Sequence, residues 1–355
     1  IKTYVTIFFP LGDSRLIKDI LITNVSDQPL DVDAIPVVEY THPDALKQFD
    51  NADWVPQTMQ SKAYRDEKGM VILTQYPFMY RDTRINYFTS NRLVSSFESE
   101  RRRFLGDNEY GTWANPLSLQ ETELGNSEAL RGDNIAALLH HLGTLQPGET
   151  TRLITQLGQD ESVAKALPSI NRYRNAEQVE QALKEMAAFW DSYLSRLQVE
   201  TPDASMNSLL NIHNPRQCHT TKNWSRYLSL YQLGFGARGM GFRDSSQDVM
   251  GILVNMAEKG KELIKQLLHV QKRDGSAMHQ FNPLTMVANE GDSREIEDAP
   301  KYYSDDHVWI VLAITAYLKE TGDLTFLDEV VPYYEKDKEG HPLESGTVLD
   351  HLRRA

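Results

Sequence analysis

Residues 175–197 read NAEQVEQALKEMAAFWDSYLSRL and separate two parts of the chain that differ in pattern. Asn175 is suited to the N-cap of a helix, and Gln178 stands at the capping-box position. The apolar residues that follow recur at spacings of three and four, which places them on one helical face: Val179, Leu183, Met186, Trp190, Leu194 and Leu197. The pattern predicts a helix that joins a β-rich half to an α-rich half.

The first half, from Ile1 to Gln159, is a series of short runs rich in Val, Ile, Thr and aromatic residues. Turn-forming clusters rather than helices separate these runs. They predict strands at 4–9, 16–24, 30–40 and 70–76, and a hairpin with arms at 136–145 and 150–157. Many short strands without intervening helices indicate an antiparallel β-sandwich.

The second half has helical periodicity. We predict helices at 245–257, 258–271, 304–321 and 347–354, with Gly322 capping the third. The last of these has no capping residue after it and no segment to cover its apolar face, so we expect more chain beyond Ala355. The predicted fold class is α+β and multidomain, with a β-sandwich at 1–170, a helical linker at 171–204 and the first part of a helical domain at 205–355.

Composition narrows the class of protein. Hydrophobic residues make up 40% and charged residues 25% of the 355 positions, which is typical of a chain that folds. No uncharged apolar run is long enough to span a bilayer, and the net charge of −13 disfavours nucleic acid and anionic membranes as partners. The single cysteine, Cys218, excludes an internal disulfide framework and favours the cytoplasm. The spacing of His and Asp residues matches no metal motif, so we expect no metal.

An acid-free segment stands out in this acidic chain. Between Ala204 and Arg243 there is no Asp or Glu, while five cations occur: Arg216, Lys222, Arg226, Arg238 and Arg243. Guanidinium groups bind phosphate oxygens well, so one interpretation is a pocket for a small anion such as phosphate. The alternative is that these cations pair with acids from elsewhere in the fold. The sequence of this segment leaves both open.

The segment ends in GFGARGMGFRDSSQD at 234–248. Its glycines formally satisfy a dinucleotide-binding pattern, but the α-rich context argues against a βαβ unit. We expect the glycines to let the backbone approach a ligand closely. Arg243 and Asp244 offer a donor and an acceptor side by side, which suits the vicinal hydroxyls of a sugar. The alternative is a helix start with Asp244 as its N-cap.

Two further polar clusters follow. YYSDDHVW at 302–309 places adjacent carboxylates beside aromatic residues, as sugar sites often do, although Ser304 or Asp305 is also a suitable helix cap. HQFNP at 279–283 is a polar loop at the end of a predicted helix.

These motifs together resemble glycoside hydrolase family 94, which contains cellobiose, cellodextrin and chitobiose phosphorylases. The resemblance rests on NPRQC at 214–218, Ser225-Arg226, RGMGFRDSSQD at 238–248, DGS at 274–276 and DDHVW at 305–309. It implies a β-sandwich, a helical linker and an (α/α)6 barrel, of which this chain holds the first part. It also implies inverting phosphorolysis of a β-glucosidic disaccharide by a homodimer, with inorganic phosphate as co-substrate and no cofactor.

By position, the resemblance gives Arg226 a role in binding phosphate. It gives Arg238, Arg243 and Asp244 a role in holding the non-reducing glucosyl unit, with Gln247 and Asp248 in the same loop. The family's general acid is an Asp in an Asp-Trp-Asn-Asp-like segment. No such segment occurs here, so we assign no catalytic residue to this chain, expect the acid beyond Ala355, and expect the chain alone to be inactive.

The substrate is a finer question. Within the family, IHNPRQCHTTKNW at 212–224 is most similar to cellobionic acid phosphorylases, which implies 4-O-β-D-glucosyl-D-gluconate as substrate, with cellobiose or another β-glucoside as the alternative. Two hypotheses come from other classes of protein. One is a non-catalytic carbohydrate-binding protein, and the other is a hydrolase with the same barrel.

Overall fold

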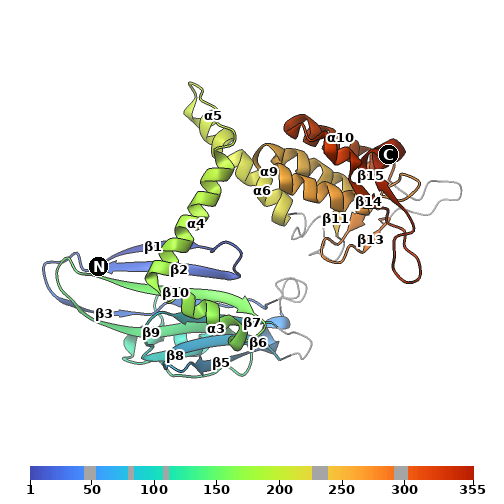
Figure 1. Ribbon diagram of the computed structural model, residues 1–355. Helices are drawn as coiled ribbons and strands as arrows, with labels where there is room; N and C mark the ends of the chain where they lie inside the picture. Colours follow the sequence, from blue (N-terminus) through green and yellow to red (C-terminus); the bar gives the residue numbers. More distant parts are fainter. Residues whose placement is uncertain (44–52, 79–83, 107–111, 226–238, 292–302) are drawn as a thin grey trace. The chain divides into compact units, whose positions relative to one another are not determined.

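The computed structural model describes residues 1–43, 53–78, 84–106, 112–225, 239–291 and 303–355. The chain forms two compact units, Ile1–Ala188 and Phe189–Ala355, and each is described by itself (Figure 1). None of the helices within the described ranges combines the length and the apolar character that crossing a bilayer requires.

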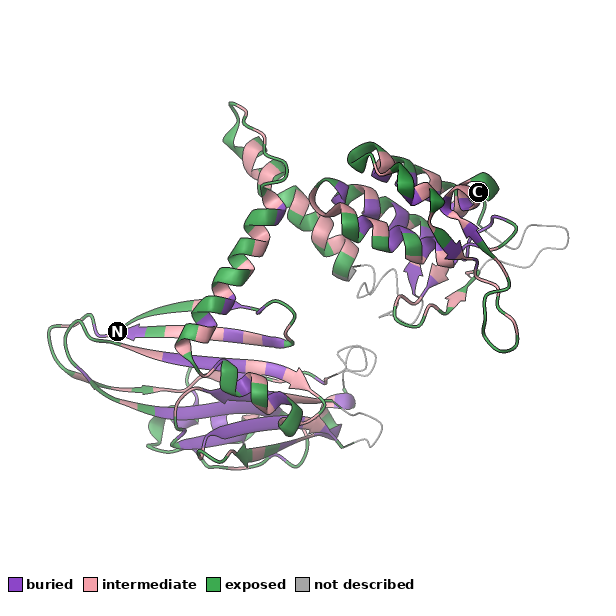
Figure 2. Cartoon of the chain, viewed as in Figure 1, coloured by how far each residue is buried: buried purple, intermediate pink, exposed green. Residues whose placement is uncertain are grey.

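Two antiparallel sheets build the first unit. One has the strand order β1-β2-β10-β7-β6-β5, and in the other β9 pairs with β3, β4 and β8. The strands of the larger sheet are β1 Lys2–Phe8, β2 Arg15–Thr23, β5 Met59–Arg65, β6 Val71–Pro77, β7 Ile85–Ser90 and β10 Thr150–Asp160. Those of the smaller are β3 Leu30–Ala34, β4 Val37–Glu39, β8 Ser96–Glu100 and β9 Asn134–Leu145. Leu73 and Phe88 of the larger sheet pack with Phe97 and Leu138 of the smaller, so the central strands are largely buried (Figure 2). The predicted β-sandwich is confirmed.

Prolines account for two differences from the predicted elements of this unit. The single strand predicted at 30–40 is two strands, because Pro36 has no N–H to donate and lies between β3 and β4. The helix α3, Val163–Arg172, was not predicted because Pro168 lies inside it. Its buried Ala166 and Ile170 pack against residues of β6 and β7. Short helical turns complete the unit: η1 Val55–Thr58, α2 Arg101–Leu105 and η2 Leu117–Gln120.

The predicted joining helix is α4, Ala176–Leu194. The Asn175 side chain accepts a hydrogen bond of 2.8 Å from the Glu177 amide, which confirms its N-cap role. Val179 and Ala182 are buried in a cluster with apolar residues of β1, β2 and β10.

Helices dominate the second unit, as predicted. They are α5 Ala204–Ser208, η3 Leu209–His213, α6 Asn214–Thr220, η4 Thr221–Ser225, α9 Phe242–His269, α10 Asp306–Thr321, η5 Leu324–Asp328 and α11 Val348–Arg354. Between them lie the short strands β11 Met240–Gly241, β12 Gln280–Phe281, β13 Ala288–Asn289, β14 Val330–Pro332 and β15 Ser345–Thr347. α10 packs along α9 (Figure 1). The two helices predicted at 245–257 and 258–271 form α9 together, and a kink at Met256 with φ −145° marks where they meet. Gly322 ends α10 in the left-handed conformation, as predicted.

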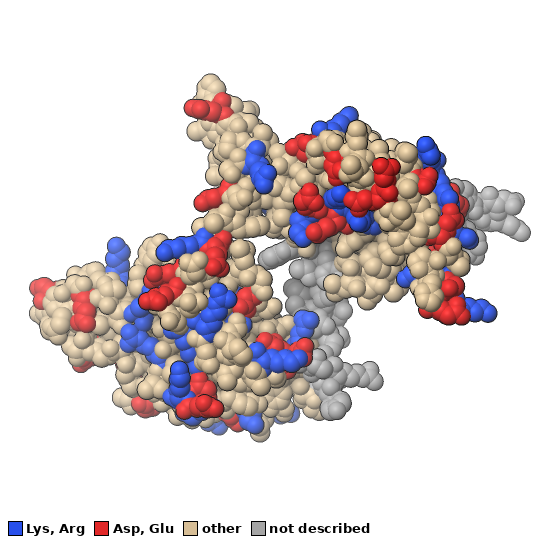
Figure 3. All heavy atoms as spheres, in the orientation of Figure 1, with Lys and Arg blue, Asp and Glu red and all other residues tan. Residues whose placement is uncertain are grey.

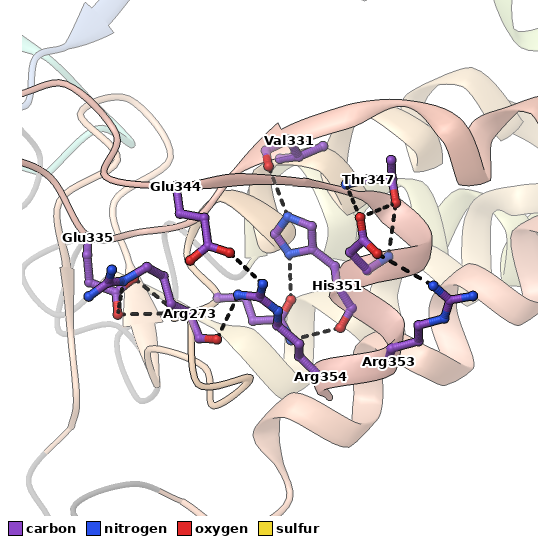
Figure 4. Close-up of polar contacts among 10 residues, drawn as sticks. Arg273, Val331, Glu335, Glu344, Thr347, His351, Arg353 and Arg354 are labelled. Carbon is purple, nitrogen blue, oxygen red and sulfur yellow. Dashed lines mark hydrogen bonds and ion pairs between the residues drawn. The ribbon is translucent and has the colours of Figure 1, made fainter.

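A buried histidine ties α11 to the rest of the unit (Figure 4). His351 Nδ1 lies 2.7 Å from Gln271 Oε1, and its Nε2 lies 3.0 Å from the Val331 carbonyl oxygen. Gln271 Nε2 donates to the Gly275 and His351 carbonyls, so its Oε1 must face the imidazole. Burial lowers the pKa of His351, although the hydrogen bond to the Val331 carbonyl acts in the opposite direction. Val348 is also fully buried, so the expectation that this helix lacks cover for its apolar face is wrong at that position.

The chain just before β11 lies close to β12. Met240 pairs with Phe281 and Gly241 with Gln280. Gly239, just before β11, has φ +101°, and a Cβ there would lie 2.7 Å from the Phe281 carbonyl oxygen. We expected a glycine of this run to allow a close approach to a ligand. At Gly239 the close neighbour is the backbone of residue 281 instead, so that expectation is wrong there.

We predict that Gly239→Ala destabilises the second unit by about 2 kcal/mol or more, because it combines a positive φ with a backbone clash. The matched control is Gly340→Ala. Gly340 also has a positive φ, +88°, but a Cβ there meets nothing within 4 Å, so the cost is about 1 kcal/mol. Thermal melting of both variants measures the difference. Equal losses would contradict the close approach at Gly239.

His140 predicts a pH dependence in the first unit. It is 1% exposed in β9, its Nδ1 lies 2.9 Å from the Leu93 carbonyl oxygen, and its Nε2 has no partner in the described part of the chain. Burial lowers the pKa of His140, and Arg92 adds to the effect. A lowered folded-state pKa gives stability that is present above the unfolded pKa of about 6.5 and is lost as pH falls through the folded value.

In His140→Asn the amide still donates to Leu93 but does not titrate. We therefore expect amide hydrogen exchange in β9, corrected for its intrinsic pH dependence, to speed up less between pH 7 and pH 5 in the variant than in the wild type. The same acceleration in both proteins would show that His140 does not cause it.

Candidate active site

The pairing of β11 with β12 brings three polar segments together. The Phe242 amide, at the start of α9, donates a hydrogen bond of 2.9 Å to the His279 carbonyl, just before β12. The first residues of α10 then contact both segments, as the two side-chain pairs below show. Residues 243, 279 and 305, distant in sequence, therefore lie in one polar cluster.

The first ion pair joins α9 to α10. Arg243 Nη1 donates to Asp305 Oδ2 at 3.1 Å, and the same oxygen accepts from Trp309 Nε1 at 3.2 Å. These hydrogen bonds, from Trp309 and then from Arg243, lower the pKa of Asp305 and keep it charged, although burial acts in the opposite direction. The side chains of Arg243 and Asp305 are 51% and 49% exposed, so a ligand can reach both.

Asp305 occupies the N-cap position of α10, as the alternative interpretation predicted. Its side chain, however, makes no capping hydrogen bond. Its carboxylate accepts hydrogen bonds from Arg243 and Trp309 instead. The backbone of Asp305 therefore occupies the N-cap position, but its side chain does not cap the helix.

The second pair joins a histidine to a carboxylate and is better shielded. His279 Nδ1 lies 2.8 Å from Asp306 Oδ2, with the two side chains 26% and 3% exposed. The Tyr303 ring stacks on the imidazole at 3.8 Å between centroids and an interplanar angle of 17°. The sequence marked both segments as polar clusters but gave no sign that they pair. Asp306 is buried in the first turn of α10, where a carboxylate requires a partner, but this burial is evident only in the structure.

The first two turns of α9 place the predicted sugar-binding residues on two faces. Arg243 and Gln247, four residues apart, are both exposed, whereas Asp244 and Asp248 are half-buried. The helix is capped at Gly241, so the alternative of Asp244 as the N-cap is wrong, and Asp244 lies in the first turn instead. There its charge is favourable to the helix dipole.

Asp248 is half-buried, and after the larger effect of burial its negative charge raises the pKa of Cys218 in α6. Of the residues predicted to bind sugar, the structure brings Arg243 into the polar cluster.

The other basic residues of the acid-free segment have different surroundings. Arg226 and Arg238 lie outside the described residues. Arg216 lies over the Trp190 ring at 5.8 Å, and His219 packs edge-on against three aromatic rings of α4. Lys222 borders a hollow of about 230 Å³ that Met240 also lines, and burial lowers its pKa. Of the predicted pairings with distant acids, Arg243 makes one.

Charge and metal chemistry complete the description. Acidic and basic side chains are intermixed on the face of the molecule that Figure 3 shows. Within the described ranges, no group of three or more His, Cys, Asp or Glu side chains is placed to hold a metal ion.

Comparison with known proteins gives the family. The family model "Glycosyl hydrolase 94, supersandwich domain" matches residues 1–176, and "Glycosyl hydrolase 94 superfamily, catalytic domain" matches residues 189–355. N,N'-diacetylchitobiose phosphorylase of Vibrio furnissii is 30% identical over 99% of this chain and 44% of its own length. Solabiose phosphorylase of Paenibacillus borealis is 30% identical over 74% of this chain and 30% of its own length. Cellobionic acid phosphorylase of Neurospora crassa is 29% identical over 71% of this chain and 30% of its own length.

The chain spans less than half the length of these relatives. Its two units correspond to the two matched domains, and the polar cluster at residues 243, 279 and 305 lies in the catalytic one. The chain therefore belongs to glycosyl hydrolase family 94.

Proposed function

We propose that the full-length protein containing this chain is an inverting disaccharide phosphorylase that releases α-D-glucose 1-phosphate from a β-1,4-glucosidic bond. The observation that carries the proposal is the half-exposed cluster of Arg243, Asp305 and Trp309. It offers guanidinium donors, a charged acceptor and an indole within one site, which is the chemistry that a glucosyl unit needs. Membership of the family supports it.

The mechanism assigns each group a task. Arg243, Asp244 and Arg238 hold the glucosyl hydroxyls while the ring flattens toward an oxocarbenium ion, and Gln247 and Asp248 are the further candidates for sugar contacts in the same segment. Arg226 orients phosphate, whose oxygen attacks C1 on the face opposite the leaving group. The bond from C1 to the glycosidic oxygen breaks, a new bond from C1 to the phosphate oxygen forms, and a carboxylic acid protonates the leaving oxygen. That acid is the Asp of the family's Asp-Trp-Asn-Asp-like segment, which residues 1–355 do not contain.

We infer that the substrate is 4-O-β-D-glucosyl-D-gluconate, giving D-gluconate as the second product. The similarity of residues 212–224 to cellobionic acid phosphorylases supports this. The relatives named for diacetylchitobiose and solabiose are 30% identical over 99% and 74% of this chain, against 29% over 71% for the cellobionic acid phosphorylase, so overall similarity does not favour cellobionic acid. Cellobiose, diacetylchitobiose and solabiose are the competing substrates.

Four further properties follow as proposals. The reaction requires phosphate but no metal or organic cofactor. The full-length protein is a homodimer, it works in the cytoplasm, and it serves the breakdown of cellulose-derived sugars. They rest on the single cysteine and on the family resemblance.

We predict that the full-length protein, given each candidate disaccharide and phosphate, releases α-glucose 1-phosphate fastest from cellobionic acid, and that EDTA leaves the rate unchanged. Proton NMR identifies the anomer. Release of free glucose would instead indicate a hydrolase, and binding without turnover of any disaccharide would favour a carbohydrate-binding protein. Faster phosphorolysis of another disaccharide would change the substrate and leave the reaction class intact.

We predict that Arg226→Ala raises the KM for phosphate at least about tenfold and the KM for the disaccharide much less, because its charge-assisted hydrogen bonds are made to phosphate. Arg216→Ala is the matched control. Arg216 belongs to the same cationic segment but stacks on Trp190, so both Michaelis constants should stay near wild type. A comparable rise of both constants in the Arg226 variant would contradict the assignment.

A further inference from the structure

Two adjacent carboxylates at the start of α10 have different partners. Asp305 is half-exposed and bonds to Arg243, whereas Asp306 is buried and bonds to His279. A buried carboxylate at this position is costly unless it has a firm partner, and the imidazole is that partner. The His279–Asp306 pair is therefore a built feature of the site.

The imidazole of His279 is fixed on three sides. Asp306 holds Nδ1 at 2.8 Å, and Tyr303 covers one face of the ring. Gly291 lies against the Cδ2 edge of the ring. Its φ is +83°, and a Cβ at this position would lie 2.8 Å from Cδ2 of His279. The backbone of His279 is fixed as well, through the Phe242 amide.

The fixed ring leaves one nitrogen for a ligand. Hydrogen bonding to Asp306 places the proton on Nδ1, so the neutral ring presents the lone pair of Nε2. Among the residues that the structure describes, none bonds to Nε2, and the side chain is 26% exposed. Asp306 thus orients an acceptor in the same polar cluster as the guanidinium of Arg243.

The chemistry of this acceptor selects its ligand. A lone pair on Nε2 needs a donor, and a neutral sugar hydroxyl is a donor as well as an acceptor, whereas phosphate offers mainly acceptor oxygens. We therefore expect a hydroxyl rather than phosphate at Nε2.

We propose that His279 is a substrate-binding residue whose Nε2 accepts a hydrogen bond from a hydroxyl of the glucosyl unit, and that Asp306 is its positioning residue. The inference rests on the proposed function for the identity of the sugar. It adds His279 to Arg243 among the residues that bind sugar, whereas Arg226 is proposed to bind phosphate.

Two substitutions of His279 separate binding from structure. In His279→Asn the amide nitrogen takes the place of Nδ1 and keeps the bond to Asp306, but Nε2 is lost. In His279→Gln the amide takes the place of Nε2, but the bond to Asp306 is lost. The control is His341→Ala, which removes a 76% exposed histidine paired with Asp337 in the same unit.

Calorimetry on the full-length protein measures the binding of methyl β-D-glucopyranoside and of inorganic phosphate separately. We expect His279→Asn to weaken the binding of the glucoside about five- to tenfold, which is the effect of one lost hydrogen bond. The binding of phosphate should weaken less than about twofold. Asp306→Asn should weaken the binding of the glucoside less than His279→Asn does, because the amide oxygen of the new asparagine still accepts a hydrogen bond from Nδ1 of His279. His341→Ala should change neither affinity.

Two results would overturn the inference. One is His279→Asn with wild-type affinity for the glucoside while His279→Gln is destabilised, because that pattern means a structural role only. The other is a loss of phosphate affinity that equals or exceeds the loss for the glucoside. If His279→Asn does not fold, the histidine ring ¹⁵N resonances of the wild type decide. The His279 Nε2 signal must shift on addition of the glucoside, and an unchanged signal would refute the contact.

These measurements do not depend on turnover. If the wild-type protein phosphorolyses no disaccharide, the proposed function fails. Selective loss of glucoside binding in His279→Asn would still support the contact.

Discussion

The site depends on the close contact between two short strands. At Gly239 the chain comes so near to the backbone of residue 281 that no Cβ fits between them, and the pairing of β11 with β12 follows directly. That pairing fixes the start of α9 against the residue before β12. Arg243 and His279 are then neighbours by construction, and the polar cluster needs only the first turn of α10 to be complete. A two-strand contact thus positions groups that come from two helices and a loop.

Electrostatics then gives the adjacent carboxylates of α10 different tasks. The Asp305 side chain is half-exposed, accepts hydrogen bonds from an indole and a guanidinium, and stays charged. It can therefore exchange one of these partners for a ligand. Asp306 is buried and cannot exchange its partner without a large desolvation cost. One carboxylate is therefore available for binding, and the other holds an imidazole in place. Burial alone accounts for the distinction, because the residues are chemically identical neighbours.

The sequence predicted the elements better than their contacts. Periodicity located α4, the two parts of α9 and the β9–β10 hairpin, because each is set by neighbours within a few residues. Periodicity did not predict α3, because a proline inside a helix, here Pro168, is unfavourable. Tertiary packing of Ile170 nevertheless stabilises this helix. The pairs Arg243–Asp305 and His279–Asp306 join residues 62 and 27 positions apart, and both depend on turns whose geometry the sequence does not specify. Motif resemblance marked Arg243, whereas His279 was marked only as part of a polar loop, because its partner becomes evident only in the fold.

The distribution of charge along the chain bears on the proposed binding of a neutral sugar and a phosphate dianion in the same domain. The acid-free segment from Ala204 to Arg243 ends where the acids begin, at Asp244. Arg243 belongs to both regions, since it closes the cationic segment and pairs with Asp305. Under the proposed function, Arg243 would therefore lie where a sugar held by the polar cluster meets a phosphate drawn to the cationic segment. Holding the two reactants close together would lower the entropic cost of the reaction between them.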